Sequence, residues 1–526
     1  MILKKFPDKK AFKKMAQKYN VIPVCTRILA DTLTPVSILK KLYDKKEPIF
    51  LLESVEGGEK WARYSFLGIS VKSRIRVLKN NIEICSDKNI KNIPHNGDPL
   101  KILQKLTAEY IPAPIKELPG FWCGMTGYIS YEMVSFFEDV QAFLPEDKAY
   151  AHFIIPDEII IFDNMKHTMT CIGIAYIDNK SQWQEAYEKA CKKVEKIIQK
   201  TFARDSVTPT HCLKKETLES TTFSCSDDNT ALSRNTCNSH KQPNSKSDEI
   251  SLVPEMKLDV FKSKVKKIKK HIIDGDIIQA VLSQKFTCNT AVDPVKLYRA
   301  QRYINPSPYM FFMHFEDMTI AGSSPETMVR LENSTATLRP IAGTRQRGET
   351  QARDMALANE LLNDEKEKAE HLMLVDLGRN DLGRIATTGS VQVTDLMFVE
   401  KYSHVMHLVS NISCDVKKGM DAWDILKASF PAGTLSGAPK IRAMEIISEL
   451  EDDFRGVYGG AAGYISFSGN MDMAITIRTA VMENDSLTIR AGAGIVYDSD
   501  PDQEYQECIN KAKSVEAALK LAMSSS

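Results

Sequence analysis

The sequence predicts an α+β fold built on large antiparallel β-sheets. Short apolar runs with the lengths and residue types of strands recur through both halves of the chain. A helix does not follow each of these runs, which argues against a doubly wound parallel sheet. With 526 residues and 43% hydrophobic composition, the chain can form several ordinary domains, or fewer and larger ones with a substantial core.

The overall charge and the cysteines narrow the classes of function. A formal net charge of +1 gives no electrostatic case for nucleic acid or a membrane as a partner. The eleven cysteines are scattered without a C-x-x-C pair, which is typical of free thiols in a reducing cytosol rather than of disulfides or a zinc site. The N-terminus lacks an apolar signal core and no run is long and charge-free enough to span a bilayer, so we expect a cytoplasmic protein.

The N-terminal half is expected to mix helices with short strands. We predict a strand from residue 21, a basic helix over 1–20, and helices over 34–43 and 182–201. Further strands are expected at 49–55, 64–69, 75–78, 159–162 and 168–176. The glycine-rich, aromatic segment 120–131 suits a strand that packs closely against another element, because glycine admits a neighbouring backbone.

Residues 203–251 differ in composition from the rest of the chain. Ser, Thr, Asn, Asp and Lys dominate there, and large aliphatic residues nearly vanish. Such a segment cannot bury enough apolar surface to offset the entropy of ordering it, so we predict a disordered linker or a long surface loop. The linker divides the chain into an N-terminal region, 1–202, and a C-terminal region, 252–526.

The C-terminal region is expected to hold runs of strands interrupted by helices. Helices are predicted over 254–273, 365–381, 440–450 and 503–521. Strands are predicted at 277–286, 311–315, 319–321, 327–331, 335–338, 391–398, 463–467, 473–482 and 487–491.

Two pairs of glutamates are candidates for a metal site. Glu367 and Glu370 are three residues apart on the helix predicted over 365–381, so their carboxylates share one face. Glu504 and Glu507 repeat this spacing on the last predicted helix. Two such helices facing each other would suit Mg²⁺, which takes oxygen ligands and keeps positions open for substrate oxygens. On spacing alone, the alternative is an exposed helix face that carries solvated glutamates.

Glycine loops and one arginine are candidates for anion binding. Loops 433–439 and 491–494 offer backbone N–H groups, although neither fits a nucleotide-binding motif and each alone is more often an ordinary turn. Arg478 falls within the predicted strand 473–482, where its charge needs an acidic partner or a ligand carboxylate. Cys123 lacks the G-x-C-x-G elbow of a glutaminase thiol, so we predict a core position for it.

A series of motifs along nearly the whole chain carries a family resemblance. They read Leu-Leu-Glu-Ser at 51–54, Asn-Pro-Ser-Pro-Tyr-Met at 305–310, Pro-Ile-Ala-Gly-Thr-Arg at 340–345 and Gly-Thr-Leu-Ser-Gly-Ala-Pro-Lys at 433–440, with further matches at 275–284, 324–326, 369–376, 402–407 and 491–494. Together they resemble the chorismate-utilising enzyme family, most closely its anthranilate-forming branch. The resemblance implies two interwoven domains on antiparallel sheets flanked by helices, with 1–202 as a regulatory region and 252–526 as the chorismate-binding catalytic region.

The resemblance also implies the residues of an active site. Mg²⁺ would be bound by Glu370 and Glu507, with the other member of each pair as a helper, and would hold the ring carboxylate of chorismate. Glu326 is implied as the proton donor to a departing hydroxyl, and His407 is assigned to the elimination of pyruvate. Substrate contacts are implied for Gly343, Thr344, Thr434, Tyr458, Arg478, Gly492, Ala493 and Gly494.

Two positions separate the branches of the family. Relatives that add water carry a lysine where this sequence has Gln279, and a neutral amide is too weak a base for that reaction. Relatives that form aminodeoxychorismate carry a nucleophilic lysine where this sequence has Ala342. The resemblance therefore implies formation of anthranilate and pyruvate from chorismate and ammonia. A tryptophan-sensing paralogue that has lost catalysis is the alternative, and the intact glutamate, arginine and histidine positions argue against it.

The same resemblance implies partners and regulation. Ammonia would come from a separate glutamine amidotransferase subunit, in a heterotetramer of two large and two small subunits. L-Tryptophan would act as a feedback inhibitor, with its ammonium group at Glu53 and Ser54 and its indole against Pro308, Tyr309 and Met310. Each motif alone also fits an ordinary strand end or turn, but their presence in one chain favours a binding site.

Overall fold

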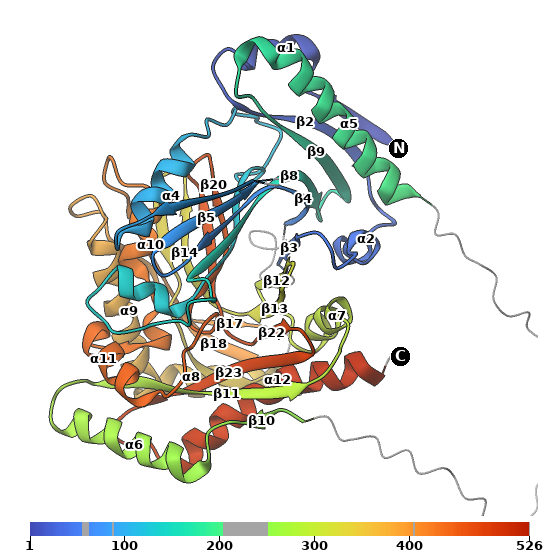
Figure 1. Cartoon of the computed structure of the whole chain (residues 1–526). Helices are drawn as coiled ribbons and strands as arrows, with labels where there is room; N and C mark the ends of the chain where they lie inside the picture. Colours follow the sequence, from blue (N-terminus) through green and yellow to red (C-terminus); the bar gives the residue numbers. More distant parts are fainter. Residues whose placement is uncertain (55–62, 87–88, 204–250, 403–404, 525–526) are drawn as a thin grey trace, which may run out of the picture.

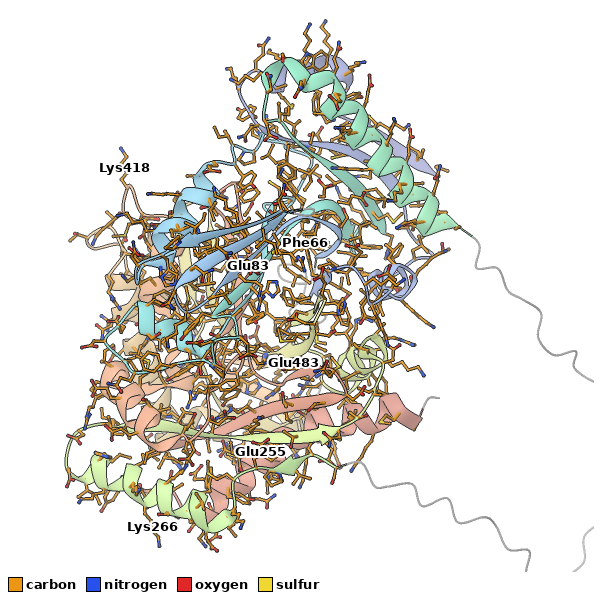
Figure 2. The ribbon with its side chains drawn as sticks, in the orientation of Figure 1. Phe66, Glu83, Glu255, Lys266, Lys418 and Glu483 are labelled. Carbon is orange, nitrogen blue, oxygen red and sulfur yellow. The ribbon has the colours of Figure 1, made fainter. Side chains whose placement is uncertain are left out.

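The computed structural model describes residues 1–54, 63–86, 89–203, 251–402 and 405–524 (Figure 1). The linker predicted from the sequence lies outside the described residues, except for Ala203 and Ser251 at its ends. Within the described ranges, no helix is long and apolar enough to cross a membrane. Charged side chains such as Lys266 and Lys418 project from the edges of the molecule (Figure 2).

Antiparallel β-structure dominates the described chain. Its 23 strands pair into one continuous hydrogen-bonded network, and all pairs of these strands are antiparallel. Helices pack around the network (Figure 1). The structure therefore confirms the predicted α+β class with large antiparallel sheets and flanking helices.

The N-terminal region supplies the first nine strands. They are β1 (Ile2–Phe6), β2 (Val21–Leu29), β3 (Ile49–Glu53), β4 (Tyr64–Val77), β5 (Asn81–Ser86), β6 (Asn89–Pro94), β7 (Gly124–Ile129), β8 (Ala151–Asp163) and β9 (Thr168–Tyr176). The described α-helices of this region are α1 (Lys9–Met15), α2 (Pro35–Leu42), α4 (Pro99–Ala108) and α5 (Trp183–Phe202). Helix α5 packs on β2 and β9 at one end of the molecule (Figure 1).

The C-terminal region supplies the remaining strands and the helices of the lower part of Figure 1. The strands are β10 (Val253–Pro254), β11 (Gln279–Asn289), β12 (Tyr309–Phe315), β13 (Met318–Ser324), β14 (Thr327–Glu332), β15 (Thr335–Leu338), β16 (Ile341–Gln346), β17 (Gln392–Lys401), β18 (Val405–Asp415), β19 (Gly437–Ala438), β20 (Ala461–Ser466), β21 (Met471–Ile475), β22 (Thr479–Glu483) and β23 (Ser486–Ile495). The α-helices are α6 (Leu258–Ile273), α7 (Pro294–Ile304), α8 (Gln351–Asn363), α9 (Glu365–Gly383), α10 (Ala422–Ser429), α11 (Lys440–Leu450) and α12 (Pro501–Ser524). Helices α7, α8 and α10 are additional to those expected from the sequence.

Strands of the two regions are interleaved in the same sheet network. Strand β3 pairs with β12, with Leu51 opposite Phe312. Strand β7 pairs with β20, with Gly127 opposite Gly463. These pairings give the interwoven arrangement that the family resemblance implied. The domain boundaries at 1–202 and 252–526 stay a prediction.

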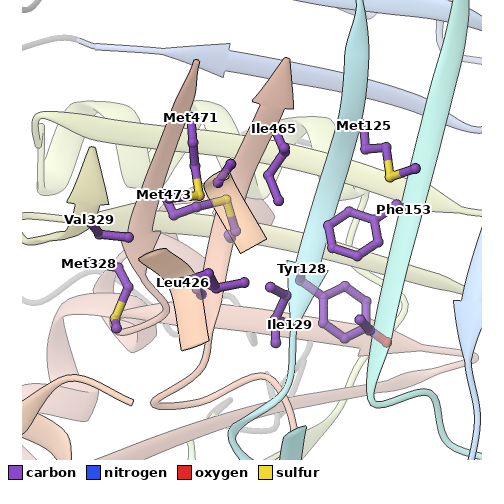
Figure 3. Packing of buried hydrophobic residues seen from close by; sticks show 14 of the residues in the cluster. Met125, Tyr128, Ile129, Phe153, Met328, Val329, Leu426, Ile465, Met471 and Met473 are labelled. Carbon is purple, nitrogen blue, oxygen red and sulfur yellow. The ribbon is translucent and has the colours of Figure 1, made fainter. Parts of the chain in front are cut away.

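Strand β12 faces two hydrophobic cores. Phe311, Met313 and Phe315 lie in one core, whereas Met310 and Phe312 lie in the other. Successive side chains of a strand point to opposite faces, so one mainly apolar strand can pack on both sides. Figure 3 shows part of the first core, where residues of β7 and β8 pack together with residues of β14, β20, β21 and α10.

Three expected elements differ in the structure. Residues 1–20 do not form one helix, because β1 pairs with β2 and α1 begins only after Asp8, which caps it by accepting the N–H of Ala11. The two strands expected between 64 and 78 form the single strand β4, which bulges along its pairing with β8. The strand expected over 473–482 is divided into β21 and β22.

The glycine-rich segment at 120–131 packs closely, as expected. A Cβ atom on Gly127 would lie 1.9 Å from the carbonyl oxygen of His152 in β8. Only glycine permits this approach of two backbones. Cys123 has no exposed surface, which confirms its predicted core position.

Candidate active site

A cavity of about 560 Å³ gathers most of the predicted site residues. It lies among β11, β16, β18, β23, α9, α12 and the loop between β13 and β14. Of the predicted catalytic, metal and substrate-binding residues, those that line it are Glu326, Gly343, Thr344, Glu370, His407, Thr434, Tyr458, Arg478, Gly492, Gly494 and Glu507. Residues separated by up to 181 positions in the sequence, from Glu326 to Glu507, thus meet at one place.

The two glutamate pairs project into the cavity from the N-terminal parts of α9 and α12. Asp364 caps α9 by accepting the N–H groups of Lys366 and Glu367, and this cap fixes the first turn. Burial raises the pKa of Glu370, and the nearby charges of Glu367 and Glu507 raise it further. The carboxylates of the two helices therefore repel each other electrostatically.

The chemistry of these four carboxylates fits a hard divalent cation. They supply anionic oxygen atoms from two helices to one cavity, which suits Mg²⁺. Burial, followed by the charge of Glu507, raises the pKa of Glu504. In the described part of the chain no three acidic, histidine or cysteine side chains already stand at metal-binding spacing. Glu507 instead pairs with Lys511, its Oε1 atom lying 2.7 Å from Nζ.

Glu326 is a buried acid in the short loop between β13 and β14. Its backbone carbonyl accepts the N–H of Ile475 at 3.0 Å, which ties the loop to β21. The hydroxyl of Thr434 donates to Glu326 Oε1 at 3.0 Å. Burial raises the pKa of Glu326 to about 8, against the opposing effects of Thr434, Arg478 and Lys511. The carboxyl is therefore mainly protonated at neutral pH and can donate a proton.

His407 is positioned by the pairing of β16 with β18. Thr344 lies opposite His407, whose Nδ1 atom is 3.0 Å from the Thr344 hydroxyl and 3.1 Å from the carbonyl oxygen of Gly343. A carbonyl only accepts, so the bond to Gly343 places the hydrogen on Nδ1 and leaves Nε2 able to accept a proton. Burial lowers the pKa of His407, which favours this neutral form.

Arg478 lies between two strands rather than within one, so the expectation of a mid-strand position is wrong. Its φ angle of 50° belongs to the left-handed region, which cannot continue a β-strand. This backbone separates β21 from β22 and leaves Arg478 lining the cavity. Its Nη1 atom donates to Asn305 Oδ1 at 3.5 Å, and burial lowers the pKa of the guanidinium while Glu326 raises it.

The glycine segment 491–494, expected as a loop, lies within β23, and its glycines have close neighbours. A Cβ on Gly492 would lie 2.8 Å from the hydroxyl of Tyr458, and one on Gly494 would lie 2.4 Å from Nε2 of Gln279. Ala493 differs, because side chains alternate along a strand and its methyl group lies fully buried in the second core. Ala493 can therefore contact a substrate only through its backbone.

Two lysines that were not expected from the sequence, Lys366 and Lys511, also line the cavity. Lys511 Nζ donates to the carbonyl oxygen of Gly492 at 2.8 Å as well as pairing with Glu507. The spacing in the sequence already indicated this ion pair, because Lys511 follows Glu507 by one helical turn. Gln279 and Ala342, the two branch-specific positions, also line the cavity.

A second cavity of about 440 Å³ contains the residues predicted to bind tryptophan. Glu53, Ser54, Pro308, Tyr309 and Met310 all line it. Its remaining wall includes charged and aromatic residues that the sequence analysis did not assign, namely Arg63, Arg330, Glu332, Asp472, Tyr64, Phe66, Phe121 and Tyr464.

The carboxylate of Glu53 is already paired, in contrast to the expected role with an ammonium group. Its Oε1 atom accepts the hydroxyl of Tyr298 at 2.9 Å and lies 2.7 Å from Nε of Arg302, both on α7. Burial raises the pKa of Glu53, and Arg302 opposes this. Asp472 supplies an alternative acid in the cavity, where its Oδ1 atom accepts the Tyr309 hydroxyl at 2.8 Å.

Comparison with known proteins identifies the family. Residues 54–517 match the family described as chorismate binding enzyme. The chain belongs to this family. Chorismate-binding enzymes of known name are similar to it over nearly their whole length. It is 44% identical to anthranilate synthase component 1 of Aquifex aeolicus (strain VF5), covering 97% of each protein, and 41% identical to that of Acetivibrio thermocellus, covering 98% of this chain and 99% of the relative.

Solved structures of chorismate-binding enzymes share the fold. Anthranilate synthase component I from Streptococcus pneumoniae TIGR4 superimposes with a TM-score of 0.69 at 34% identity, covering 93% of this chain and 98% of that one. MenF, the menaquinone-specific isochorismate synthase from Escherichia coli, gives a TM-score of 0.65 at 18% identity, covering 97% and 98%. The second likeness shows the common fold alone.

The raised pKa of Glu326 predicts a pH dependence of stability. The folded state holds this proton more tightly than the unfolded chain, in which the ordinary pKa is 4.5. The resulting stability is fully present below pH 4.5 and is lost as the pH rises through about 8. Because Glu326→Gln cannot ionise, its free energy of unfolding should fall less than that of the parent between about pH 5 and pH 9, by on the order of a few kcal/mol.

Denaturant unfolding at a series of pH values measures this difference. Glu449→Gln, at an exposed carboxyl on α11, is the matched control and should follow the parent. Equal pH dependence in Glu326→Gln and the parent would contradict the buried, protonated state of Glu326.

Proposed function

We propose that this chain is component I of an anthranilate synthase, a lyase that forms anthranilate and pyruvate from chorismate and ammonia in the first committed step of tryptophan biosynthesis. The observation that carries the proposal is the pair Gln279 and Ala342, which both line the large cavity. At these positions the chain has neither a base to activate water nor an amine to attack the ring. The two named relatives at 41–44% identity support the same function.

The cavity contains groups of both charges that suit different parts of chorismate. Arg478, the hydroxyl of Tyr458 and the backbone at Gly492 and Gly494 supply donors that suit the enolpyruvyl carboxylate of chorismate. The glutamates of α9 and α12 would hold Mg²⁺, which supplies positive charge for the ring carboxylate when bound. The substrate would thus be oriented by its two carboxylates.

Glu326 is the acid for departure of the ring hydroxyl. Ammonia forms a new C–N bond, the ring C–O bond breaks, and the hydroxyl leaves as water after taking the proton of Glu326. The Thr434 hydroxyl, 3.0 Å from Oε1, holds the carboxyl in place. A carboxyl with a pKa of about 8 keeps its proton at neutral pH until the leaving group develops charge.

His407 is assigned to the second half-reaction. Elimination of pyruvate requires removal of a ring proton as the enolpyruvyl C–O bond breaks. The ring becomes aromatic, and the departing enolate takes up one proton to give pyruvate. The neutral imidazole, held through Nδ1, leaves Nε2 able to accept a proton.

The direct test is product formation by the purified chain. With chorismate, ammonium and Mg²⁺, we expect fluorescent anthranilate and one equivalent of pyruvate. Glutamine should not replace ammonium, because Cys123 is fully buried and lacks a glutaminase motif. Addition of a separate glutamine amidotransferase subunit should permit the use of glutamine. Isochorismate, aminodeoxychorismate or no product would contradict the proposal.

The proposed metal site predicts loss of activity when either principal glutamate is neutralised. Glu370→Gln and Glu507→Gln each remove an anionic oxygen, so turnover at fixed Mg²⁺ should fall by more than about 100-fold, the upper effect of losing an outer-shell partner. Glu365→Gln changes a carboxylate on the same helix whose side chain is 88% exposed, and it should retain activity. Normal turnover and Mg²⁺ dependence in Glu370→Gln and Glu507→Gln would show that these residues are not the ligands.

We also propose that the second cavity binds L-tryptophan as a feedback inhibitor. Its aromatic wall includes Phe121 and Tyr464, whose rings stack with centroids 4.1 Å apart and suit an indole. Ser54 and Asp472 offer polar groups for the amino-acid moiety. In the complete proposal the chain acts in the cytoplasm, within a heterotetramer of two large and two amidotransferase subunits.

Ser54→Phe should separate inhibition from catalysis. The larger side chain would fill part of the second cavity without touching the first, so turnover should stay within about twofold of the parent while tryptophan sensitivity is lost. Initial rates over a tryptophan titration measure both properties. A variant as sensitive as the parent, or inhibition competitive with Mg²⁺, would place the inhibitor elsewhere.

A further inference from the structure

A small cavity of about 40 Å³ also reaches Glu326. Glu326, Thr434 and Leu374 line both this cavity and the large one. A buried water needs about 10–15 Å³ and two to four polar partners. The small cavity can therefore hold a few water molecules, whereas it is far too small for a substituted six-membered ring.

The other polar groups of the small cavity include Asp381 and Ser429. Asp381 lies near the C-terminal end of α9 and is 8% exposed. Lys440 Nζ donates to Asp381 Oδ2 at 2.8 Å and to the carbonyl oxygen of Ser429 at 3.2 Å. The ammonium thus joins the end of α9, the end of α10 and the start of α11, on both sides of the loop that carries Thr434.

The two acids share one electrostatic feature, which is that burial raises the pKa of each. Burial raises the pKa of Asp381, Lys440 and Arg384 lower it, and Glu138 raises it. Around Glu326, burial dominates over the opposing charges of Arg478 and Lys511. Burial therefore shifts both acids towards the protonated form.

The proposed reaction requires proton return to Glu326 in every cycle. Ammonia adds to the ring as –NH₃⁺ and then loses one proton, while the hydroxyl leaves as water with the proton of Glu326. One proton is released and one must reach the Glu326 carboxylate, so the cycle balances. A substrate or product molecule in the large cavity would lie between the Glu326 carboxyl and the solvent of that cavity.

We propose that the small cavity is the proton-return route to Glu326, with Asp381 as the carboxylate that accepts a proton from solvent and passes one on through intervening water. This inference rests on the proposed function. Asp381 ends each cycle unchanged, and Lys440 keeps its carboxylate at the cavity. An ion pair with a purely structural role would not require a cavity shared with the catalytic acid.

A comparison of the first turnover with later turnovers tests the route. Glu326 begins protonated, so Asp381→Asn should form the first equivalent of product at about the parental rate. Later turnovers should slow, and the ratio of first-turnover to steady-state rate should rise by about tenfold or more over the parent. Asp376→Asn is the control, because this aspartate is on the same helix with a side chain that is 67% exposed, and it should behave as the parent.

Leu377→Phe provides an independent variant that leaves the Asp381–Lys440 pair intact. Leu377 lines the small cavity but not the large one, so a larger ring should obstruct the route and raise the same ratio. Rapid-quench measurement of anthranilate gives both rates, and this variant decides the question if Asp381→Asn does not fold. Equal slowing of first and later turnovers, or no change in either variant, would overturn the route. Absence of anthranilate from the parent would instead overturn the proposed function and this inference with it.

Discussion

The pairing of β12 with β3 and β13 is the constraint on which the active cavity and the second cavity depend. It places Met310 opposite Glu53, which brings two motifs far apart in the sequence to one wall of the second cavity. On its other side, β13 runs into the loop that holds Glu326 in the active cavity. A slip of one residue in β12 would exchange the side chains of its two cores, so packing on both faces fixes the register.

The active cavity concentrates groups that are costly to bury. Removing a carboxylate from water costs several kcal/mol unless a partner compensates for it. Burial raises the pKa of Glu326, Glu370 and Glu504. The negative charge of Glu507 raises the pKa of Glu370 and Glu504 further. A divalent cation between α9 and α12 would relieve that repulsion. The large hydrophobic cores on both faces of the sheet network offset the cost while the cavity remains ready for charged ligands.

The turn before β12 lies between the two cavities. Pro308 lines the second cavity, and the Oδ1 atom of Asn305 in the same turn accepts Nη1 of Arg478 at 3.5 Å. The arginine proposed to bind substrate and the wall of the proposed inhibitor site therefore meet through a few residues of one segment. Such proximity is a physical basis for coupling only if the two states of the turn differ in affinity for the two ligands.

Local features of the sequence determined the α+β class, most helices and the position of several site residues. The three-residue spacing of Glu367 and Glu370 suffices to place both on one helix face, because helical periodicity is a local property. Likewise, the glycines of 120–131 indicated close backbone approach, which the contact of Gly127 confirms. The motifs, read in order, were enough to indicate the family.

Only the tertiary structure decided the positions that depend on distant neighbours. It turned the carboxylate of Glu53 towards Arg302, placed Ala493 in the core and gave Arg478 a left-handed backbone between two strands. It also brought Asp381 and Glu326 to one small cavity, for which the sequence held no signal. Strand faces, buried charge partners and cavities are set by packing between segments far apart in the chain, and a local pattern does not contain that information.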